Sequence, residues 1–190
     1  MAEKSDVRRI AVTGVLSALS IALFLTPFGY IPTPLGVSLT VVHVPAIIGA
    51  VLEGPVVGIV IGGIFGATAL VKAAIAPQGP IDLVFVNPLI SVLPRLLIGL
   101  AAWVVYSAFR GKWTGVAAAM AGIAGSLTNS VFVLGALLIF RVIAPAVAGA
   151  IFVTNGLLEA ALAAVLTFGV VAVWKGIESR TGKAKLAEEK

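Results

Sequence analysis

Long apolar stretches separated by short polar breaks dominate this chain. No Lys, Arg, Asp or Glu lies between Arg9 and Glu53, and this stretch has room for two membrane-spanning helices of about 20 residues each. Three prolines and two glycines at residues 27–36 interrupt it, and such a cluster predicts a loop. The Glu53-Gly54-Pro55 sequence marks the next sharp break.

Further breaks divide the rest of the chain at residues 77–80, 110–112 and 141–145. The pattern therefore predicts a single membrane domain over residues 1–190, with six transmembrane helices followed by a charged tail. The helices are expected at about residues 8–27, 37–52, 55–72, 87–109, 114–140 and 146–174, and the tail at residues 175–190. Several glycines in the third helix would let a neighbouring helix approach closely.

The composition agrees with a lipid environment. Of the 190 residues, 60% are hydrophobic and 11% are charged, and the mean hydropathy is +1.15, whereas soluble domains are about one quarter charged. The expected fold class is an all-α integral membrane protein. The net charge of +5 does not predict nucleic-acid binding, because no basic run is interleaved with aromatic residues.

The basic residues predict the orientation of the chain. With six spans and an inner N-terminus, ten Lys and Arg residues fall on the inner side and two, Lys72 and Arg141, on the outer side. Since cytoplasmic segments are enriched in basic residues, both termini are expected in the cytoplasm. The first apolar run is too long for the core of a cleavable signal peptide and is interpreted as a membrane helix.

A few polar side chains interrupt the predicted spans, where an ionisable group costs about 2.5–3.5 kcal/mol at a helix centre. Asn87, Ser91 and Arg95 are four residues apart and would share one face of a helix. Asn155 and Glu159 would likewise share a face of the last helix. From a helical rise of about 1.5 Å per residue, all five are expected in the outer half of the membrane or near its midplane.

Asn129 and His43 are expected at a similar depth. Polar groups that share one depth predict a cavity open to the outside, and Arg95 predicts an anionic ligand, because a guanidinium suits a carboxylate. Other interpretations remain open. Arg95 and Glu159 could form a buried ion pair, the asparagines could join helices, and His43 could be a packing residue.

The first helix carries a stripe of small residues four apart: Gly14, Ala18 and Ala22. Such a stripe lets another helix pack closely, and ordinary packing inside the bundle would use the same pattern.

Motifs of catalysis are missing from the sequence. It contains no phosphate-binding loop, no Gly-x-Ser-x-Gly and no His-Glu-x-x-His, and it has one His and no Cys. We therefore expect neither an enzyme nor a bound cofactor or metal.

Three segments make the chain similar to a known family. They are Ala18-x-x-x-Ala22, residues 38–55 and, above all, Asn87-Pro88-Leu89-Ile90-Ser91-Val92-Leu93-Pro94-Arg95. Over about residues 8–175 the chain resembles the substrate-binding S components of energy-coupling factor (ECF) transporters, and it is most similar to pantothenate-type members.

The resemblance implies a six-helix protein of the prokaryotic inner membrane that captures a vitamin from outside with high affinity. It implies docking on a module of one transmembrane coupling protein and two ATPases, and toppling driven by ATP hydrolysis. Ala18 and Ala22 would contact the coupling protein, and the segment from Asn87 to Arg95 would contribute to the pocket.

The choice of vitamin is less determined. Pantothenate has one carboxylate, two hydroxyls and an amide, which would suit Arg95 and several asparagines. Folate and riboflavin usually need aromatic stacking, and aromatic residues make up only 7% of the chain, with few in the outer halves of the spans. Pyridoxine-type and pyrimidine-type vitamins stay open. So do two other classes of protein, an uncoupled transporter or channel and a structural membrane subunit without a ligand.

Overall fold

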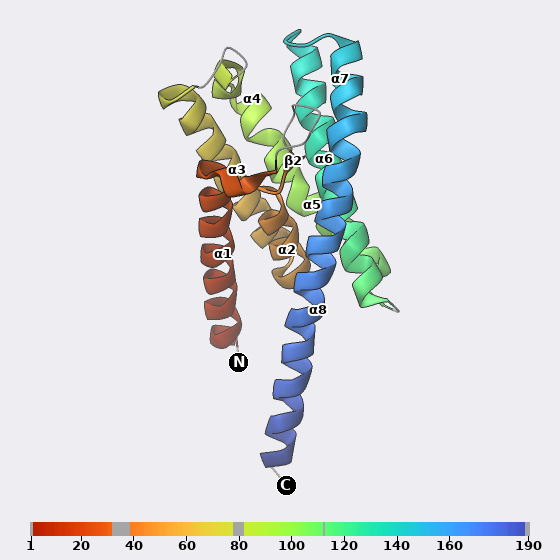
Figure 1. Cartoon of the computed structure of the whole chain (residues 1–190). Helices are drawn as coiled ribbons and strands as arrows, with labels where there is room; N and C mark the ends of the chain where they lie inside the picture. Colours follow the sequence, from red (N-terminus) through yellow and green to blue (C-terminus); the bar gives the residue numbers. More distant parts are fainter. Residues whose placement is uncertain (1, 32–38, 78–81, 112, 189–190) are drawn as a thin grey trace.

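The computed structural model describes residues 2–31, 39–77, 82–111 and 113–188, which form a helical bundle (Figure 1). The α-helices are α1 (Ala2–Leu25), α2 (Val44–Glu53), α3 (Pro55–Ile75), α4 (Pro88–Ser91), α5 (Leu93–Phe109), α6 (Thr114–Ile139), α7 (Pro145–Ile151) and α8 (Leu157–Glu188). The other elements are the 3-10 helices η1 (Pro27–Gly29) and η2 (Asp82–Val86), the π-helical turn η3 (Phe152–Gly156), and the strands β1 (Tyr30–Ile31) and β2 (Leu39–Thr40), which pair antiparallel.

Five helical stretches are long and apolar enough to cross a membrane: Asp6–Leu25, Pro55–Ile75, Pro88–Phe109, Thr114–Ile139 and Pro145–Gly176. Large apolar side chains point outward along them, among them Val15, Leu100 and Val165. Large exposed apolar surfaces of this kind suit a lipid environment. Each helix also satisfies its own backbone polar groups, as a membrane span requires. The prediction of an all-α membrane protein is confirmed.

The predicted helix at residues 37–52 differs most from the structure. Helix α2 begins only at Val44 and has ten residues, so it is about 15 Å long, half of the hydrocarbon thickness of about 30 Å. Leu39 and Thr40 lie in β2, and residues 37 and 38 lie outside the described residues. The cause is Pro45, which suits the first turn of a helix but would break a helix already in progress.

The predicted helices at residues 87–109 and 146–174 also differ in detail. A turn at Val92 separates α4 from α5, where Pro94 has no N–H group to continue the helical hydrogen bonds. At the other end α8 continues to Glu188, so most of the charged tail is helical. Ala, Glu and Lys are strong helix formers, and they favour this extension.

Helix α2 lies at the centre of the bundle, packed against α1, α3, α5, α6 and α8, with Val44 to Val51 buried. Beside it α3 and α5 meet backbone to backbone. A Cβ added at Gly58 would lie 2.9 Å from Cα of Gly99, and one added at Gly62 would collide with the carbonyl of Arg95. The predicted close approach at the α3 glycines is therefore confirmed, and it fixes the position of Arg95.

Candidate ligand-binding site

A cavity of about 470 Å³ lies between α1, α3, α5, α6 and the segments that precede α2 and α4. Its size falls within the usual range of small-molecule sites. Charged, aromatic and small side chains line it: Phe24, Tyr30, Thr40, Val42, Phe65, Ala69, Lys72, Ala73, Asp82, Phe85, Arg95 and Asn129. We call this the first cavity.

Arg95 is the most buried charge in the first cavity, with 7% of its surface exposed. Its guanidinium carbon lies 5.4 Å from the ring centre of Phe65 and 5.3 Å from that of Phe85. Nη1 donates a hydrogen bond to the carbonyl of Ile90, and Nε has no hydrogen-bond partner among the described residues. The two rings hold the cation by cation–π attraction, and Arg95 adds its positive charge to the lining of the first cavity.

Lys72, Tyr30 and Asp82 also line the first cavity, although their places in the sequence predict loop or interface residues. Nζ of Lys72 lies 4.9 Å from the ring centre of Phe24 and 6.0 Å from that of Tyr30. Burial, with help from Asp82 and against the influence of Arg95, raises the pKa of the Tyr30 hydroxyl to about 12. That hydroxyl donates a hydrogen bond to the carbonyl of Phe24 at 3.4 Å.

The cavity is richer in aromatic residues than the composition predicts. Phe24 closes α1, Tyr30 begins β1 and Phe85 belongs to η2, so three of the four lining rings come from the ends of spans or from connections. The expectation of few aromatic residues in the outer halves of the spans did not consider the connections, which bring Tyr30 and Phe85 to the cavity. Scarcity of aromatic side chains is therefore no argument against a ligand with a planar ring.

A second cavity of about 210 Å³ lies between α6 and the α7–η3–α8 stretch. Asn129 lines both cavities, and its Oδ1 is buried with no hydrogen-bond partner within the part of the chain that the structure describes. The other lining residues are Ser130, Val133, Leu134, Ile151, Asn155, Gly156 and Glu159. Because they share this amide, the two cavities are neighbours, and we call the pair the composite site.

Glu159 ties α8 to the segment before α2. Its Oε1 accepts hydrogen bonds from the backbone N–H of Thr40 at 2.7 Å and from the Thr40 hydroxyl at 3.0 Å. Thr40 lines the first cavity and Glu159 the second, so this contact lies between them. Arg95 and Glu159 form no ion pair in the described structure, and the ion-pair interpretation is not supported.

Asn155 lies in η3, the π-helical turn. It is 5% exposed, and its Oδ1 accepts a hydrogen bond from the Thr154 hydroxyl at 3.3 Å. Asn155 and Glu159 line the same cavity, as their spacing of four residues predicts. A π-helical turn adds a residue to the turn and is frequent at functional sites, and the hydropathy pattern does not indicate one here.

Asn87, Ser91 and His43 line neither cavity. Oδ1 of Asn87 accepts a hydrogen bond from the N–H of Leu89 at 3.0 Å and caps α4, and the Ser91 hydroxyl donates to the carbonyl of Asn87 at 3.1 Å. Asn87 is extended and lies just before α4, so it does not continue the helical face of Arg95, whereas Ser91 and Arg95 both lie against Gly66 of α3. His43 is 1% exposed, and its ring nitrogens have no partner in the described ranges.

The small-residue stripe faces away from the bundle. Gly14, Ala18 and Ala22 are all exposed, and a Cβ added at Gly14 would meet no atom within 4 Å. Ser17 and Ser20 are buried on the opposite side of α1. Packing inside the bundle therefore does not explain the stripe.

Comparison with known proteins gives one family and two relatives. Residues 8–171 match the family model described as ECF transporter, substrate-specific component. The chain is 28% identical over 189 residues to the pantothenic acid transporter PanT of Lactococcus lactis subsp. cremoris, covering 89% of this chain and 94% of the relative. It is 29% identical over 135 residues to the pantothenate transporter PanT of Leuconostoc mesenteroides, covering 68% of this chain and 66% of the relative.

Proposed function

Because the chain belongs to the family of substrate-specific components of ECF transporters, we propose that it captures pantothenate outside the cell and passes it to an ECF module. It is a multi-pass transport protein of the cell membrane. Two relatives are named for pantothenate, which supports this substrate. The observation that carries the proposal is Arg95, a buried cation that lines the first cavity beside the rings of Phe65 and Phe85.

The composite site suits the chemistry of pantothenate from one end to the other. The carboxylate would lie at Arg95, with Lys72 adding positive charge, since a guanidinium binds a carboxylate through charge-assisted hydrogen bonds. The central amide would meet Asn129. The two hydroxyls would reach Asn155 and Glu159 in the second cavity, where a carboxylate oxygen accepts hydrogen bonds from hydroxyl groups. His43, Asn87 and Ser91 are left outside this pocket.

The proposed topology has six crossings with both termini in the cytoplasm. The two ends of the chain lie at the same end of the bundle (Figure 1), as an even number of crossings requires. The second crossing would combine the β2 segment with the short helix α2. Non-helical backbone is tolerated at membrane depth where protein surrounds it, and α2 is surrounded by five helices.

Docking is proposed to use the exposed stripe of Gly14, Ala18 and Ala22. Small residues permit close approach of a helix from another protein, and the stripe is uncovered in this chain. The partner would be the transmembrane coupling protein of an ECF module, which carries two ATPases.

Binding to the purified protein tests the proposed substrate. Pantothenate should bind in detergent with a sub-micromolar dissociation constant, and folate, pyridoxine and thiamin should bind at least about 100-fold more weakly. Arg95→Ala should weaken pantothenate binding by about 30-fold or more, because removing one partner of a buried charged pair costs about 2–5 kcal/mol. Arg141→Ala, a loop variant, is the matched control and should bind like the wild type.

The same panel separates the other candidates. Preferential binding of another vitamin would keep the family and replace the substrate. Binding of none of them, with uptake in cells that persists after loss of the ATPases, would indicate an uncoupled transporter. Absence of both binding and uptake would favour a structural subunit.

A further inference from the structure

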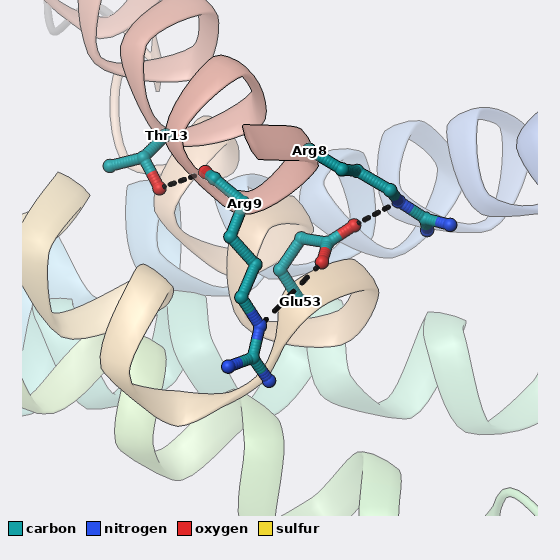
Figure 2. A network of polar contacts seen from close by, with 4 residues as sticks. All are labelled: Arg8, Arg9, Thr13 and Glu53. Atoms are coloured by element: carbon teal, nitrogen blue, oxygen red, sulfur yellow. Dashed lines mark hydrogen bonds and ion pairs between the residues drawn. The ribbon is translucent and has the colours of Figure 1, made fainter. Parts of the chain in front are cut away.

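Two arginines of α1 converge on a carboxylate at the end of α2 (Figure 2). Nε of Arg8 lies 2.7 Å from Oε1 of Glu53, and Nε of Arg9 lies 4.0 Å from Oε2. The Glu53 side chain is only 8% exposed. The guanidinium of Arg8 also lies 5.6 Å from the ring centre of Trp174 on α8. One carboxylate thus joins α1 to the centre of the bundle, next to α8.

Helix α1 needs such a connection, because little of it is embedded. Only 11% of the residues in its apolar window are buried, against 28–44% in the other four spans. A second polar contact ties its outer half, where the Ser20 hydroxyl donates to the carbonyl of Val42 at 2.9 Å. Among the described residues, α1 is therefore held near the cavity by contacts of Ser20 and Phe24 and at its other end by the Glu53 cluster.

We propose that Glu53 is a positioning residue for docking, which fixes the rotation and tilt of α1 so that the stripe of Gly14, Ala18 and Ala22 meets the coupling protein. This inference rests on the proposed function. Adjacent residues of a helix point about 100° apart, so Arg8 and Arg9 reach Glu53 from two sides. Both contacts can form only at one rotation of α1 about its own axis.

Loss of the Glu53 charge should separate docking from ligand binding. Without the carboxylate, the two adjacent arginines repel each other, and the end of α1 at Arg8 is released. The contact of Ser20 with Val42 would remain. Phe24 is the residue of α1 that lines the first cavity, and it lies one turn beyond Ser20. The cavity should therefore survive a change that disturbs the other end of the helix.

Glu53→Gln is the test, with three measurements on the full chain. Pantothenate affinity should stay within about twofold of the wild type. Co-purification with the coupling protein and its ATPases, and ATP-dependent pantothenate uptake in proteoliposomes, should each fall at least about tenfold. Since the chain has no cysteine, spin labels at Ala11→Cys and Val116→Cys report on α1 without any partner. Their distance distribution should broaden in Glu53→Gln.

Substitutions of Arg8 and Arg9 test whether the loss of module binding follows the strength of each contact with Glu53. Arg9→Gln should do less harm than Arg8→Gln, because Arg9 lies farther from Glu53 and is 59% exposed. Arg8→Glu combined with Glu53→Arg should recover more module binding than Glu53→Arg alone, since it restores an ion pair between the same helices.

The following outcomes would refute either the docking role of Glu53 or the proposed function. A Glu53→Gln variant with normal module binding, uptake and spin-label distances overturns the docking role, and so does one that loses pantothenate binding in parallel, because the contact would then only support the fold. A wild type that binds neither pantothenate nor the module would refute the proposed function itself, and the docking role with it.

Discussion

Gly66 is a sensitive test of how α3 positions the ligand site. A Cβ added at this residue would lie 2.7 Å from the carbonyl oxygen of Ser91 and 2.8 Å from Cα of Val92. Ordinary van der Waals contact begins at 3.4 Å. Gly66→Ala would therefore push the α4–α5 junction away by about 0.7 Å, because the atoms it meets are backbone atoms that cannot rotate aside.

Two opposing effects determine how much stability Gly66→Ala loses. Overpacking of a tight contact costs about 1–3 kcal/mol, and alanine in a helix recovers about 0.5–1 kcal/mol relative to glycine. The two ranges leave a net loss of stability between about zero and about 2.5 kcal/mol, and we expect a loss of about 1 kcal/mol. Since Arg95 follows the junction directly, its guanidinium should shift as well. A displacement of about 1 Å at a functional group can cost as much as 100-fold, so pantothenate affinity should fall at least about tenfold.

Gly63→Ala provides the control on the same helix. Its Cβ would meet only Cδ2 of Leu96 at 3.1 Å, and this side-chain atom can move. Thermal unfolding in detergent and titration with pantothenate should separate the two variants. If Gly66→Ala is as stable as Gly63→Ala and binds pantothenate equally well, the claim that α3 positions Arg95 through this contact is refuted.

Three further substitutions test other parts of the site. Thr40→Val removes one of the two hydrogen bonds to Glu159 and should raise the pantothenate dissociation constant about tenfold, because a hydrogen bond to a charged group contributes about 1.5–3 kcal/mol; an unchanged constant in calorimetry would contradict this. Asn87→Ala should lower stability by about 0.5–2 kcal/mol through loss of the α4 cap and leave pantothenate affinity unchanged. A large loss of affinity would indicate that Asn87 contacts the ligand. Ala18→Leu should abolish ATP-dependent uptake in proteoliposomes with normal binding in detergent, and normal uptake would argue against docking through α1.

Much of the fold could be predicted from hydropathy and charge. Breaks at proline, glycine and charged residues locate five spans within a few residues, because a membrane helix needs about 20 apolar residues. The same signal could not distinguish the short α2 from a full span. Buried extended backbone and buried helix are equally apolar, and only Pro45 at the start of α2 marks the difference.

Some of the residues that line the two cavities could be singled out from the sequence. The spacing of Asn155 and Glu159 placed them together, and Arg95 and Asn129 stood out as polar residues in apolar spans. Asn87 and Ser91 line neither cavity, because Asn87 is extended and caps α4 and the Ser91 hydroxyl donates back to the carbonyl of Asn87. Periodicity within helices also gives no information on how connections pack.

Residues from connections and span ends therefore escaped prediction. Tyr30, Asp82 and Phe85 enter the first cavity from outside the regular α-helices, and Lys72 enters from the last turn of α3. A lysine at a span end fits the charge pattern of a membrane boundary equally well. Only the tertiary structure brings its ammonium group over the Phe24 and Tyr30 rings.

Pairing of Arg95 with the pantothenate carboxylate is the central claim, and a cycle of four affinities tests it most directly. Wild type and Arg95→Ala are each titrated with pantothenate and with pantothenol, the analogue that carries an alcohol in place of the carboxylate. We expect the affinity for pantothenate to fall at least about 30-fold in Arg95→Ala and the affinity for pantothenol to change less than about threefold, a coupling of about 1.4 kcal/mol or more. Equal losses for the two ligands would show that Arg95 does not contact the carboxylate and would contradict the assignment.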